Sequence, residues 1–469
     1  MRGIWTTDEI RTAERSVMAC LPPGALMARA ARAIAVEAVA MLGFSYGARV
    51  LLLVGPGDNG ADALWAGAEL ARRGVAVQAV LGADRADQPG TAAFTGAGGR
   101  IVPLACAVDP DLVIDGLLGI GATPPLRAAM LPLVEFSRRR RVLAVDLPSG
   151  VDPNTGAVPG PAVRAERTVT MGGYKVGLMV GPGRVHAGEI RLVDIGLAPA
   201  LPAPALQVLQ PEDVTVSRPG PDSDKYTRGV VGVVAGSAQY PGAALLCTGS
   251  ARLGGVGAVR FAGRAKNEVV RAHPEVLVTE TVAEAGRVQA WVIGPGLGSA
   301  DDAVRSLREV LAQDVPVIVD ADGLNLLAQH RELLAGRRAQ TVLTPHDREF
   351  ERLFGEVGAD RVSAARRGAA DSGATVLLKG NATVVADPDG RGYVNPTGSP
   401  VLATAGSGDV LSGLIGSLLA TGVQPALAAA RAAYLHGLAA HRAAEEGPVV
   451  APDLIAGLRR VLAEAGGGV

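Results

Sequence analysis

Short runs of apolar residues alternate with longer alanine-rich amphipathic segments along most of this chain. Several runs are apolar at every position, which is typical of strands that are covered on both faces. The intervening segments, such as 61–73, fit helices that cover a parallel sheet. The pattern therefore predicts an α/β fold. In the first half the expected strands are 50–54, 75–81, 112–115, 142–146, 167–171 and 190–195.

A proline-rich segment at 197–205 separates this pattern from a second α/β alternation. Repeated prolines favour an extended linker, and 469 residues exceed what one hydrophobic core usually organises. We therefore expect two domains, at 1–205 and 211–469. In the second domain the expected strands are 230–235, 290–293, 315–320, 341–344, 375–379 and a hairpin of 383–386 with 392–395, and the expected late helices are 409–421 and 425–444.

Composition points to a small-molecule ligand. The formal net charge of −1 argues against binding nucleic acid or an anionic membrane. No apolar run approaches the roughly 20 residues that span a bilayer, and the first residues lack a signal-peptide pattern. Cys20, Cys106 and Cys247 are far apart and lack metal-ligand spacing, as fits a reducing compartment. We expect a cytoplasmic protein, and its alanine-rich helices favour a homo-oligomer, with a tetramer as the first hypothesis.

Three polar segments follow expected strands in the first half. The sequence VGPGDNGADA at 54–63 can turn tightly, and the helix that follows presents N–H groups to an anion. Asp115 precedes a glycine-rich segment, and Asp146 precedes Leu-Pro-Ser149-Gly. Parallel strands end at one sheet edge, so the three segments should meet in one cleft. Their carboxylates, with an Asn and a Ser, suit a monovalent cation or a ribose-pyridine ligand, although the first motif alone also fits a turn without a ligand.

Together with 174–178 and 181–189, these segments resemble the NAD(P)H-hydrate epimerase family over about residues 5–197. The resemblance implies a Rossmann-like three-layer αβα domain that interconverts the R and S hydrates of NADH and NADPH (NADHX and NADPHX). It implies a potassium ion held by Asn59, Asp115 and Ser149, and a catalytic Asp146 that faces the damaged ring. The implied hydrate-binding residues are Asp58, Asn59, Gly60, Ala61, Asp62, Gly119, Ile120, Gly121, Ala122, Thr123, Pro124, Pro125 and Asp146, of which 119–125 would contact the phosphates.

Three positions depart from the family motif. Asp58 replaces an Asn and adds a negative charge near a phosphate-bearing ligand. Ala61 and Ala63 replace glycines, and Ala61 adds a Cβ atom where a close backbone approach is expected. A non-catalytic binding module therefore stays open as an alternative for the first half.

The strongest motif of the second half is ATAGSGDVLSG at 403–413. Glycine-flanked N–H groups at a helix start form an anion hole for a phosphoryl group, and Asp409 is placed to act as a base. A helix cap is the alternative role for Asp409. Polar segments also follow four expected strands, at 294–298, 319–325, 344–349 and 379–383.

This constellation resembles the ribokinase-like superfamily, and within it the NAD(P)H-hydrate dehydratases, over about residues 211–465. The resemblance implies an ADP-dependent dehydration of the S hydrate, with Mg²⁺, that gives AMP and phosphate. Asp409 would be catalytic and help the C6 hydroxyl attack the terminal phosphoryl group. The implied hydrate contacts are Ala243, Gly296, Gly298, His346 and Asp409, and the implied nucleotide contacts are Lys379, Gly380, Asn381, Ala382, Thr383 and Gly408. The chief alternative is a ribokinase-like kinase of a small alcohol, with the first half as a non-catalytic ligand-binding domain that regulates it.

Overall fold

The computed structural model describes residues 1–121, 123–216 and 219–465. The chain divides into two compact units. The N-terminal unit is Gly3–Ala205, and the C-terminal unit is Leu206–Val469 together with Met1–Arg2. Among the described residues, no helix has the length and hydropathy needed to cross a membrane.

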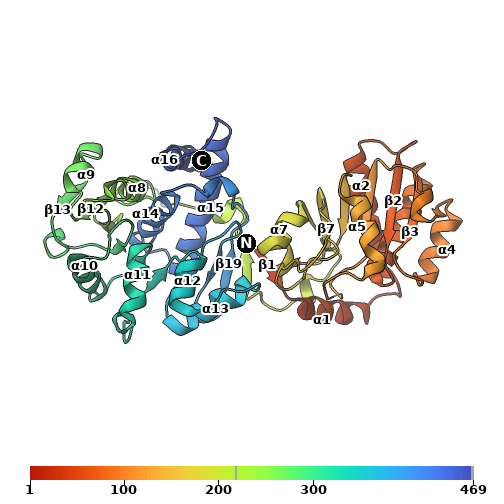
Figure 1. Ribbon diagram of the computed structural model, residues 1–469, viewed down its shortest axis with the longest axis horizontal. Helices are drawn as coiled ribbons and strands as arrows, with labels where there is room; N and C mark the ends of the chain where they lie inside the picture. The colour runs from red at the N-terminus through yellow and green to blue at the C-terminus, as the bar shows by residue number, and fades with distance from the viewer. Residues whose placement is uncertain (122, 217–218, 466–469) are drawn as a thin grey trace. The chain divides into compact units, whose positions relative to one another are not determined.

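A seven-stranded parallel sheet organises the N-terminal unit, in the order β4-β3-β2-β5-β6-β7-β9 (Figure 1). Two short strands, β1 (Arg2–Trp5) and β8 (Tyr174–Lys175), pair with each other in parallel and are not part of this sheet. The strands of the sheet are β2 (Arg49–Val54), β3 (Ala76–Leu81), β4 (Arg100–Ile101), β5 (Leu112–Gly116), β6 (Val142–Val145), β7 (Arg167–Met171) and β9 (Glu189–Val193). The helices are α1 (Thr7–Met18), α2 (Ala25–Leu42), α3 (Asp58–Arg72), α4 (Gln88–Gly96), α5 (Leu131–Ser137), α6 (Val176–Met179) and α7 (Gly181–Ala187), with 3₁₀ turns at Leu104–Cys106, Ala128–Met130 and Ala198–Ala200.

Alternate residues of β2 enter two different hydrophobic cores. On one face, Val50, Leu52 and Val54 pack with α2 and α3. On the other face, Leu51 and Leu53 pack with α5. Successive side chains of a strand point to opposite faces, so helices cover both faces of this sheet. The expected three-layer αβα arrangement is confirmed.

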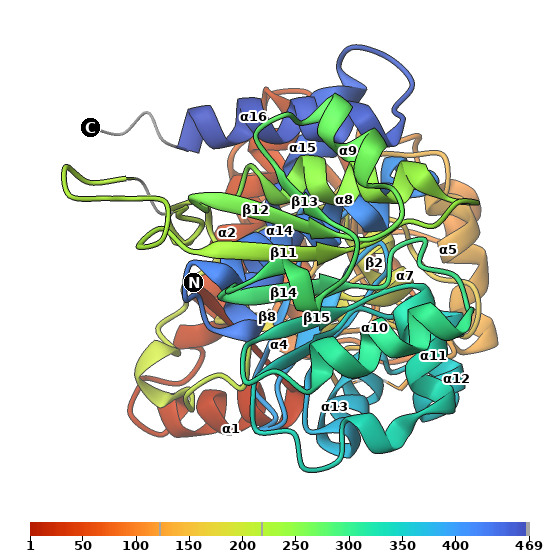
Figure 2. The same cartoon turned by 90° about the vertical axis from the view of Figure 1, so that its left-hand side faces the viewer.

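The C-terminal unit is built on a second, mostly parallel sheet, in the order β13-β12-β11-β14-β15-β16-β17-β18-β19-β10 (Figure 2). Only β18 runs antiparallel to both of its neighbours. The strands are β10 (Leu206–Val208), β11 (Val230–Val234), β12 (Ala258–Ala262), β13 (Leu277–Thr279), β14 (Ala290–Ile293), β15 (Val317–Val319), β16 (Thr341–Leu343), β17 (Thr375–Leu378), β18 (Val384–Ala386) and β19 (Gly392–Val394).

Helices α8, α14, α15 and α16 lie on one side of this sheet, and α10 to α13 lie on the other (Figure 2). Alternate residues of β11, Val231 and Val233, pack with α14 in the main core. The helices are α8 (Pro241–Ala251), α9 (Lys266–Ala272), α10 (Asp301–Leu311), α11 (Asp322–Gln329), α12 (Asp347–Phe354), α13 (Arg361–Ser372), α14 (Ser407–Ala420), α15 (Pro425–Ala444) and α16 (Ala451–Ala465), with 3₁₀ turns at Pro211–Asp213, Ala283–Ala285, Arg331–Leu333 and Pro400–Leu402.

Every expected strand is present, and its ends differ from the expected ones by at most two residues. The strands β12 and β13 were not expected, because Arg260 interrupts the apolar pattern of β12 and bonds to the carbonyl of Ala285. The helix expected from residue 61 begins three residues earlier, at Asp58. The segment 197–205 contains a 3₁₀ turn where we expected extended chain throughout.

Candidate active sites

The turn between β2 and α3 depends on two glycines. A Cβ atom on Gly60 would lie 2.0 Å from the carbonyl oxygen of Gly55, and one on Gly55 would lie 1.7 Å from that of Leu117. Neither position can accept a side chain without moving the backbone. The close approach that we expected at Ala61 therefore occurs at Gly60, and Ala61 itself is buried without such a conflict. Ala63 packs against Gly116, where the absence of a Cβ atom leaves room for its methyl group.

Asn59, Asp115 and Ser149 come together at the ends of β2, β5 and β6. Ser149 Oγ donates to Asp115 Oδ1 at 2.7 Å, and the Ser149 amide donates to Oδ2 at 2.8 Å. Asn59 Nδ2 donates to the carbonyls of Leu118, at 3.0 Å, and Val145, at 2.9 Å. Burial raises the pKa of Asp115 to about 6, although the Ser149 hydrogen bonds oppose this rise. Among the described residues Asp115 has no ion pair, so its negative charge lacks a partner.

The donor atoms of this cluster fit a monovalent hard cation. They are a carboxylate, an amide oxygen, a hydroxyl and main-chain carbonyls, which are all oxygens. A cation there would also compensate the buried charge of Asp115. Among the described residues, no group of three or more His, Cys, Asp and Glu is placed to bind a metal.

Asp146 stands at the end of β6 in the left-handed region, with φ of 63°. Its Oδ1 atom accepts from Lys175 Nζ at 2.5 Å, and Thr170 Oγ1 donates to the same atom at 3.2 Å. Lys175 also donates to Thr170 Oγ1 and to the Met171 carbonyl, and its side chain is only 1% exposed. A left-handed non-glycine residue stores strain that is common at functional sites. Lys175 had no role in our sequence analysis, although its motif formed part of the family likeness.

Two further carboxyl groups face Asp146. Burial, followed by repulsion from Asp146 and Asp58, raises the pKa of Asp62 well above its usual value, and its buried Oδ1 atom has no hydrogen-bond partner. Burial and repulsion from Asp146 also raise the pKa of Glu14, on α1. Sequence reasoning missed Glu14, because nothing local in 7–18 indicates that this helix reaches the strand ends.

The predicted phosphate segment lies close to the other predicted residues. A Cβ atom on Gly119 would lie 2.7 Å from Asn59 Oδ1, so the two residues are neighbours. Gly119 and Pro124 line the same small hollow, and Ile120 packs against the core below. Gly121, Thr123 and Pro125 are exposed, and Ala122 lies outside the described residues.

In the C-terminal unit, the predicted anion hole stands at the start of α14. Gly406, with φ of 86°, is the N-cap residue, and no side chain caps this helix. Asp409 stands in the first turn, and the capping role that we considered for it is therefore wrong. A Cβ atom on Gly408 would lie 3.5 Å from Lys379 Nζ, so two predicted nucleotide contacts adjoin each other.

Lys379 and Asp320 form the ionic centre of this site. Lys379 Nζ donates to Asp320 Oδ1 at 2.5 Å, and Ser412 Oγ of α14 donates to Oδ2 at 2.6 Å. Burial, followed by repulsion from Asp320, raises the pKa of Asp409 to about 7, and Lys379 opposes this rise. Burial disfavours the charge of Lys379, but attraction to Asp320 and Glu349 leaves its pKa raised. Asp409 is thus a carboxyl group suited to exchange a proton near neutral pH.

His346 begins α12 through a capping box. The Glu349 amide donates to His346 Nδ1 at 3.3 Å, and the His346 amide donates to Glu349 Oε2 at 2.9 Å. The His346 side chain remains 50% exposed, and Glu349 Oε2 lies 4.0 Å from Lys379 Nζ. The cap that we considered as an alternative for His346 is therefore present, and the Nε2 atom of the half-exposed ring lies 3.4 Å from Glu349 Oε1.

The remaining predicted residues lie on adjoining turns. A Cβ atom on Gly296 would lie 2.6 Å from the Ala243 Cβ, and the Gly298 amide donates to Asp322 Oδ2 at 2.9 Å. Thr383 Oγ1 donates to the Gly380 carbonyl at 3.2 Å. Gly380 and Asn381 are exposed, while Ala382 and Thr383 are buried. His436 of α15 also borders the site through the Ser407 backbone, and burial lowers its pKa to about 4.

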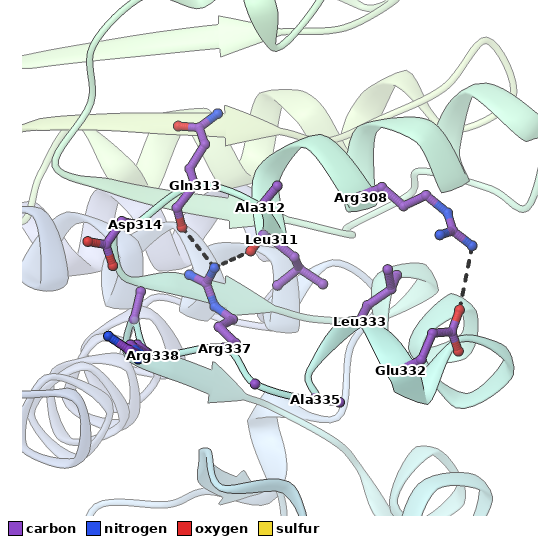
Figure 3. A pocket seen from close by; sticks show the side chains of 12 residues that line it. Arg308, Leu311, Ala312, Gln313, Asp314, Glu332, Leu333, Ala335, Arg337 and Arg338 are labelled. Carbon is purple, nitrogen blue, oxygen red and sulfur yellow. Dashed lines mark hydrogen bonds and ion pairs between the residues drawn. The ribbon is translucent and has the colours of Figure 1, made fainter.

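A separate pocket of about 410 Å³ contains none of the predicted residues. It is lined by the last turn of α10, by Gln313 and Asp314 before β15, and by 335–339 before β16 (Figure 3). Arg337 donates there to the carbonyls of Leu311 and, at 2.8 Å, Gln313. This pocket stands at the amino ends of the strands, whereas both predicted sites use the carboxyl ends.

Each of the two units matches a known protein family. Residues 23–177 match a family model described as YjeF-related protein N-terminus, and residues 231–458 match one described as NAD(P)H-hydrate dehydratase. The bifunctional NAD(P)H-hydrate repair enzyme of Mycobacterium tuberculosis is 51% identical over 446 residues, which are 92% of each chain. The enzyme of the same name from Mycobacterium leprae is 50% identical over 464 residues, or 96% of each chain. The chain belongs to the family of bifunctional NAD(P)H-hydrate repair enzymes.

Solved structures agree with this family for the C-terminal unit. The ADP/ATP-dependent NAD(P)H-hydrate dehydratase of Bacillus subtilis, co-crystallised with ATP and Mg²⁺, is 31% identical with a TM-score of 0.50. The match covers 55% of this chain and 98% of that one. A ribokinase-like superfamily protein from Enterococcus faecalis is 27% identical with a TM-score of 0.50, over 57% of this chain and 97% of that one. The expected ribokinase-like fold is confirmed, and the comparisons do not favour a small-alcohol kinase.

The electrostatics of Asp409 give a direct prediction. We expect its carboxyl to titrate near pH 7, and we expect Asp320→Asn to lower this pKa. The substitution removes a neighbouring negative charge and frees Lys379 to face Asp409. Carboxyl NMR titration of the labelled chain measures this, with the signal assigned by its loss in Asp409→Asn. Asp302→Asn, in the first turn of α10, is the matched control. An unchanged or higher pKa in Asp320→Asn would contradict this electrostatic account.

Proposed function

We propose that this chain restores hydrated NADH and NADPH by two activities. The N-terminal unit interconverts the R and S hydrates, and the C-terminal unit dehydrates the S hydrate with ADP as phosphoryl donor, giving AMP and phosphate. The observation that carries the proposal is Asp409, a carboxyl group with a pKa of about 7 in the first turn of α14. The names of the relatives, and the ATP and Mg²⁺ of the B. subtilis structure, support the substrate class.

Dehydration needs a better leaving group than hydroxide. Asp409 accepts the proton of the C6 hydroxyl while that oxygen attacks the terminal phosphoryl group and the bond to the ADP leaving oxygen breaks. The C6–O bond then breaks with loss of phosphate while a proton leaves C5 to the departing phosphate, and the C5=C6 double bond of the dihydropyridine is restored. The N–H groups of the first turn of α14, including that of Gly408, stabilise the charge of the transferring group.

The surrounding residues divide between the two ligands. Lys379, Gly408 and the exposed turn at Gly380 and Asn381 hold the nucleotide, and the half-exposed His346 ring contacts the hydrate beside Asp409. Lys379 is already paired with Asp320 and lies close to Glu349, so the nearby carboxylates outnumber its one positive charge. Mg²⁺ suits this site as an ion carried on the nucleotide phosphates, whose charge it neutralises when bound, because a few carboxylates plus phosphate are its usual ligands.

In the N-terminal unit, Asp146 and Asp62 are the groups that move protons. Lys175 fixes the orientation of the Asp146 carboxylate, which we place against the hydrated ring. Asp62, whose pKa is raised well above its usual value, is the neighbouring carboxyl that retains a proton most readily. Two carboxyl groups with different proton affinities can exchange roles as the C6 stereocentre inverts. Asp58, Gly60 and the glycines of 119–121 line the approach.

We assign a structural potassium ion to Asn59, Asp115 and Ser149. The oxygen donors and the unpaired charge of Asp115 support this assignment. When bound, the ion compensates the buried carboxylate and fixes the two segments that follow β5 and β6.

Asp409→Asn tests whether the two units carry the two activities separately. The expected result is a loss of ADP-dependent dehydration by 10²-fold or more, because the general base is absent, while epimerisation is retained. Dehydration is followed by the dihydronicotinamide absorbance, and epimerisation by separating the two hydrates without ADP. Asp302→Asn should leave both rates unchanged. Dehydration at the unmodified rate in Asp409→Asn would exclude the assigned role.

Potassium should stabilise the fold in a pH-dependent way. Because the pKa of Asp115 rises from 3.8 to about 6 on folding, its charged form costs about 3 kcal/mol above pH 6, and this cost is absent below pH 3.8. Potassium should therefore raise the unfolding temperature of the N-terminal unit more at pH 8 than at pH 5, relative to tetramethylammonium at equal ionic strength.

Two variants check that the ion acts through these ligands. Asp115→Asn should remove the potassium effect, and Ser149→Ala, which keeps the charge, should reduce it. Calorimetry in the two salts measures both. An equal potassium effect in the unmodified chain and in both variants would place the ion elsewhere.

A further inference from the structure

Helix α1 precedes the residues that match the N-terminal family model, which begin at residue 23. It is nevertheless fixed to the site. The Thr7 amide donates to Asn154 Oδ1 at 2.9 Å, and Asn154 Nδ2 donates to Thr7 Oγ1 at 3.1 Å. Asn154 belongs to the segment that follows the Ser149 turn, and Ile10 and Ala13 bury the inner face of the helix. The next residues on α1 therefore have a defined position relative to the strand ends.

Two charged residues of α1 reach the predicted site. Arg11 Nη2 lies 2.5 Å from where a Cβ atom on Gly121 would stand, so the guanidinium covers the exposed turn at 119–121. Glu14 lies one helical turn further and interacts electrostatically with Arg11, Asp146 and Asp58. Arg11 and Glu14 therefore share the face of α1 that borders the site.

The predicted N-terminal site carries more negative than positive charge, and Arg11 is a cation at its border. Asp58, Asp146 and Glu14 contribute negative charge, and Lys175 is already paired with Asp146. A dinucleotide brings at least two more negative charges, so its binding needs a further cation. Within the described parts of the chain, the Arg11 guanidinium has no hydrogen bond or ion pair, and it interacts electrostatically with Glu14.

We propose that Arg11 binds the diphosphate of the dinucleotide hydrate and so determines its affinity for the N-terminal site. This inference rests on the proposed function. A guanidinium offers paired N–H donors that match two phosphate oxygens, and its charge offsets the extra carboxylate of Asp58. The exposed glycine at 121 lets the ligand approach the guanidinium closely, because a side chain there would meet Arg11 first. The substrate class that follows is a nicotinamide ligand with an intact diphosphate.

The test compares Arg11→Ala, Arg11→Lys and Arg15→Ala in the full chain. Arg15 is the matched control, because it lies on the same helix, is exposed, and bonds only to Thr12 of its own helix at 3.0 Å. Removing one charge-assisted contact should raise the KM for epimerisation about tenfold or more in Arg11→Ala, with a much smaller change in kcat. Arg11→Lys should recover part of the affinity, and dehydration of the pure S hydrate should not change.

Binding of NADPH, which has the same diphosphate, gives a readout that needs no turnover. Its fluorescence titration should show one class of site weakened about tenfold in Arg11→Ala, while the signal of the C-terminal unit stays the same in all chains. Equal NADPH affinities, or an equal loss in Arg15→Ala, would overturn the role of Arg11. If the unmodified chain does not interconvert the hydrates, the proposed epimerase activity fails, and the NADPH comparison still decides the role of Arg11.

Discussion

In each site of this chain one lysine forms an ion pair with one carboxylate, and a second carboxyl group nearby has no ion pair among the described residues. In the N-terminal unit Lys175 pairs with Asp146, beside Asp62. In the C-terminal unit Lys379 pairs with Asp320, beside Asp409. The second carboxyl is desolvated and close to another negative charge, and both effects raise its pKa. Burial first, and then this shortage of positive charge, raises the pKa of Asp62 well above its usual value and that of Asp409 to about 7.

The fold supports this arrangement, because Asp146, Asp320 and Lys379 directly follow strands of the two sheets, and Asp62 and Asp409 lie on the helices α3 and α14 that begin near strand ends. The backbone there is held in conformations that cost energy. Asp146 and Ala321, with φ of 63° and 48°, are non-glycine residues in the left-handed region, and each immediately follows or adjoins a strand end. Gly55 and Gly60 let β2 turn into α3 with no room for a side chain. The packed layers on both faces of the sheets hold these turns in place.

The sequence was sufficient for features that are local. Continuous apolar runs predicted the strands, and the glycine-rich motifs predicted that Asn59, Asp115 and Ser149 follow strand ends and that Asp409 lies at a helix start. Features that join distant segments were missed. Nothing near Glu14 indicates that it interacts with Asp146, which lies more than a hundred residues later. The charge balance of a site also cannot be read from the sequence before its residues are brought together. The helix cap that we considered as an alternative role for Asp409 is excluded only by the structure, where Gly406 begins α14 without a side-chain cap.

The most direct test of the two-activity account is recovery of dihydronicotinamide absorbance from a mixture of both NADPH hydrate epimers. The purified chain is supplied with ADP, Mg²⁺ and K⁺, and the final amplitude is compared with the total hydrate added. The account predicts complete ADP-dependent recovery, because the N-terminal unit continuously converts the R hydrate to the S hydrate that the C-terminal unit consumes. Recovery that stops when the S hydrate is exhausted would contradict the epimerase activity, and no recovery at all would contradict the repair function.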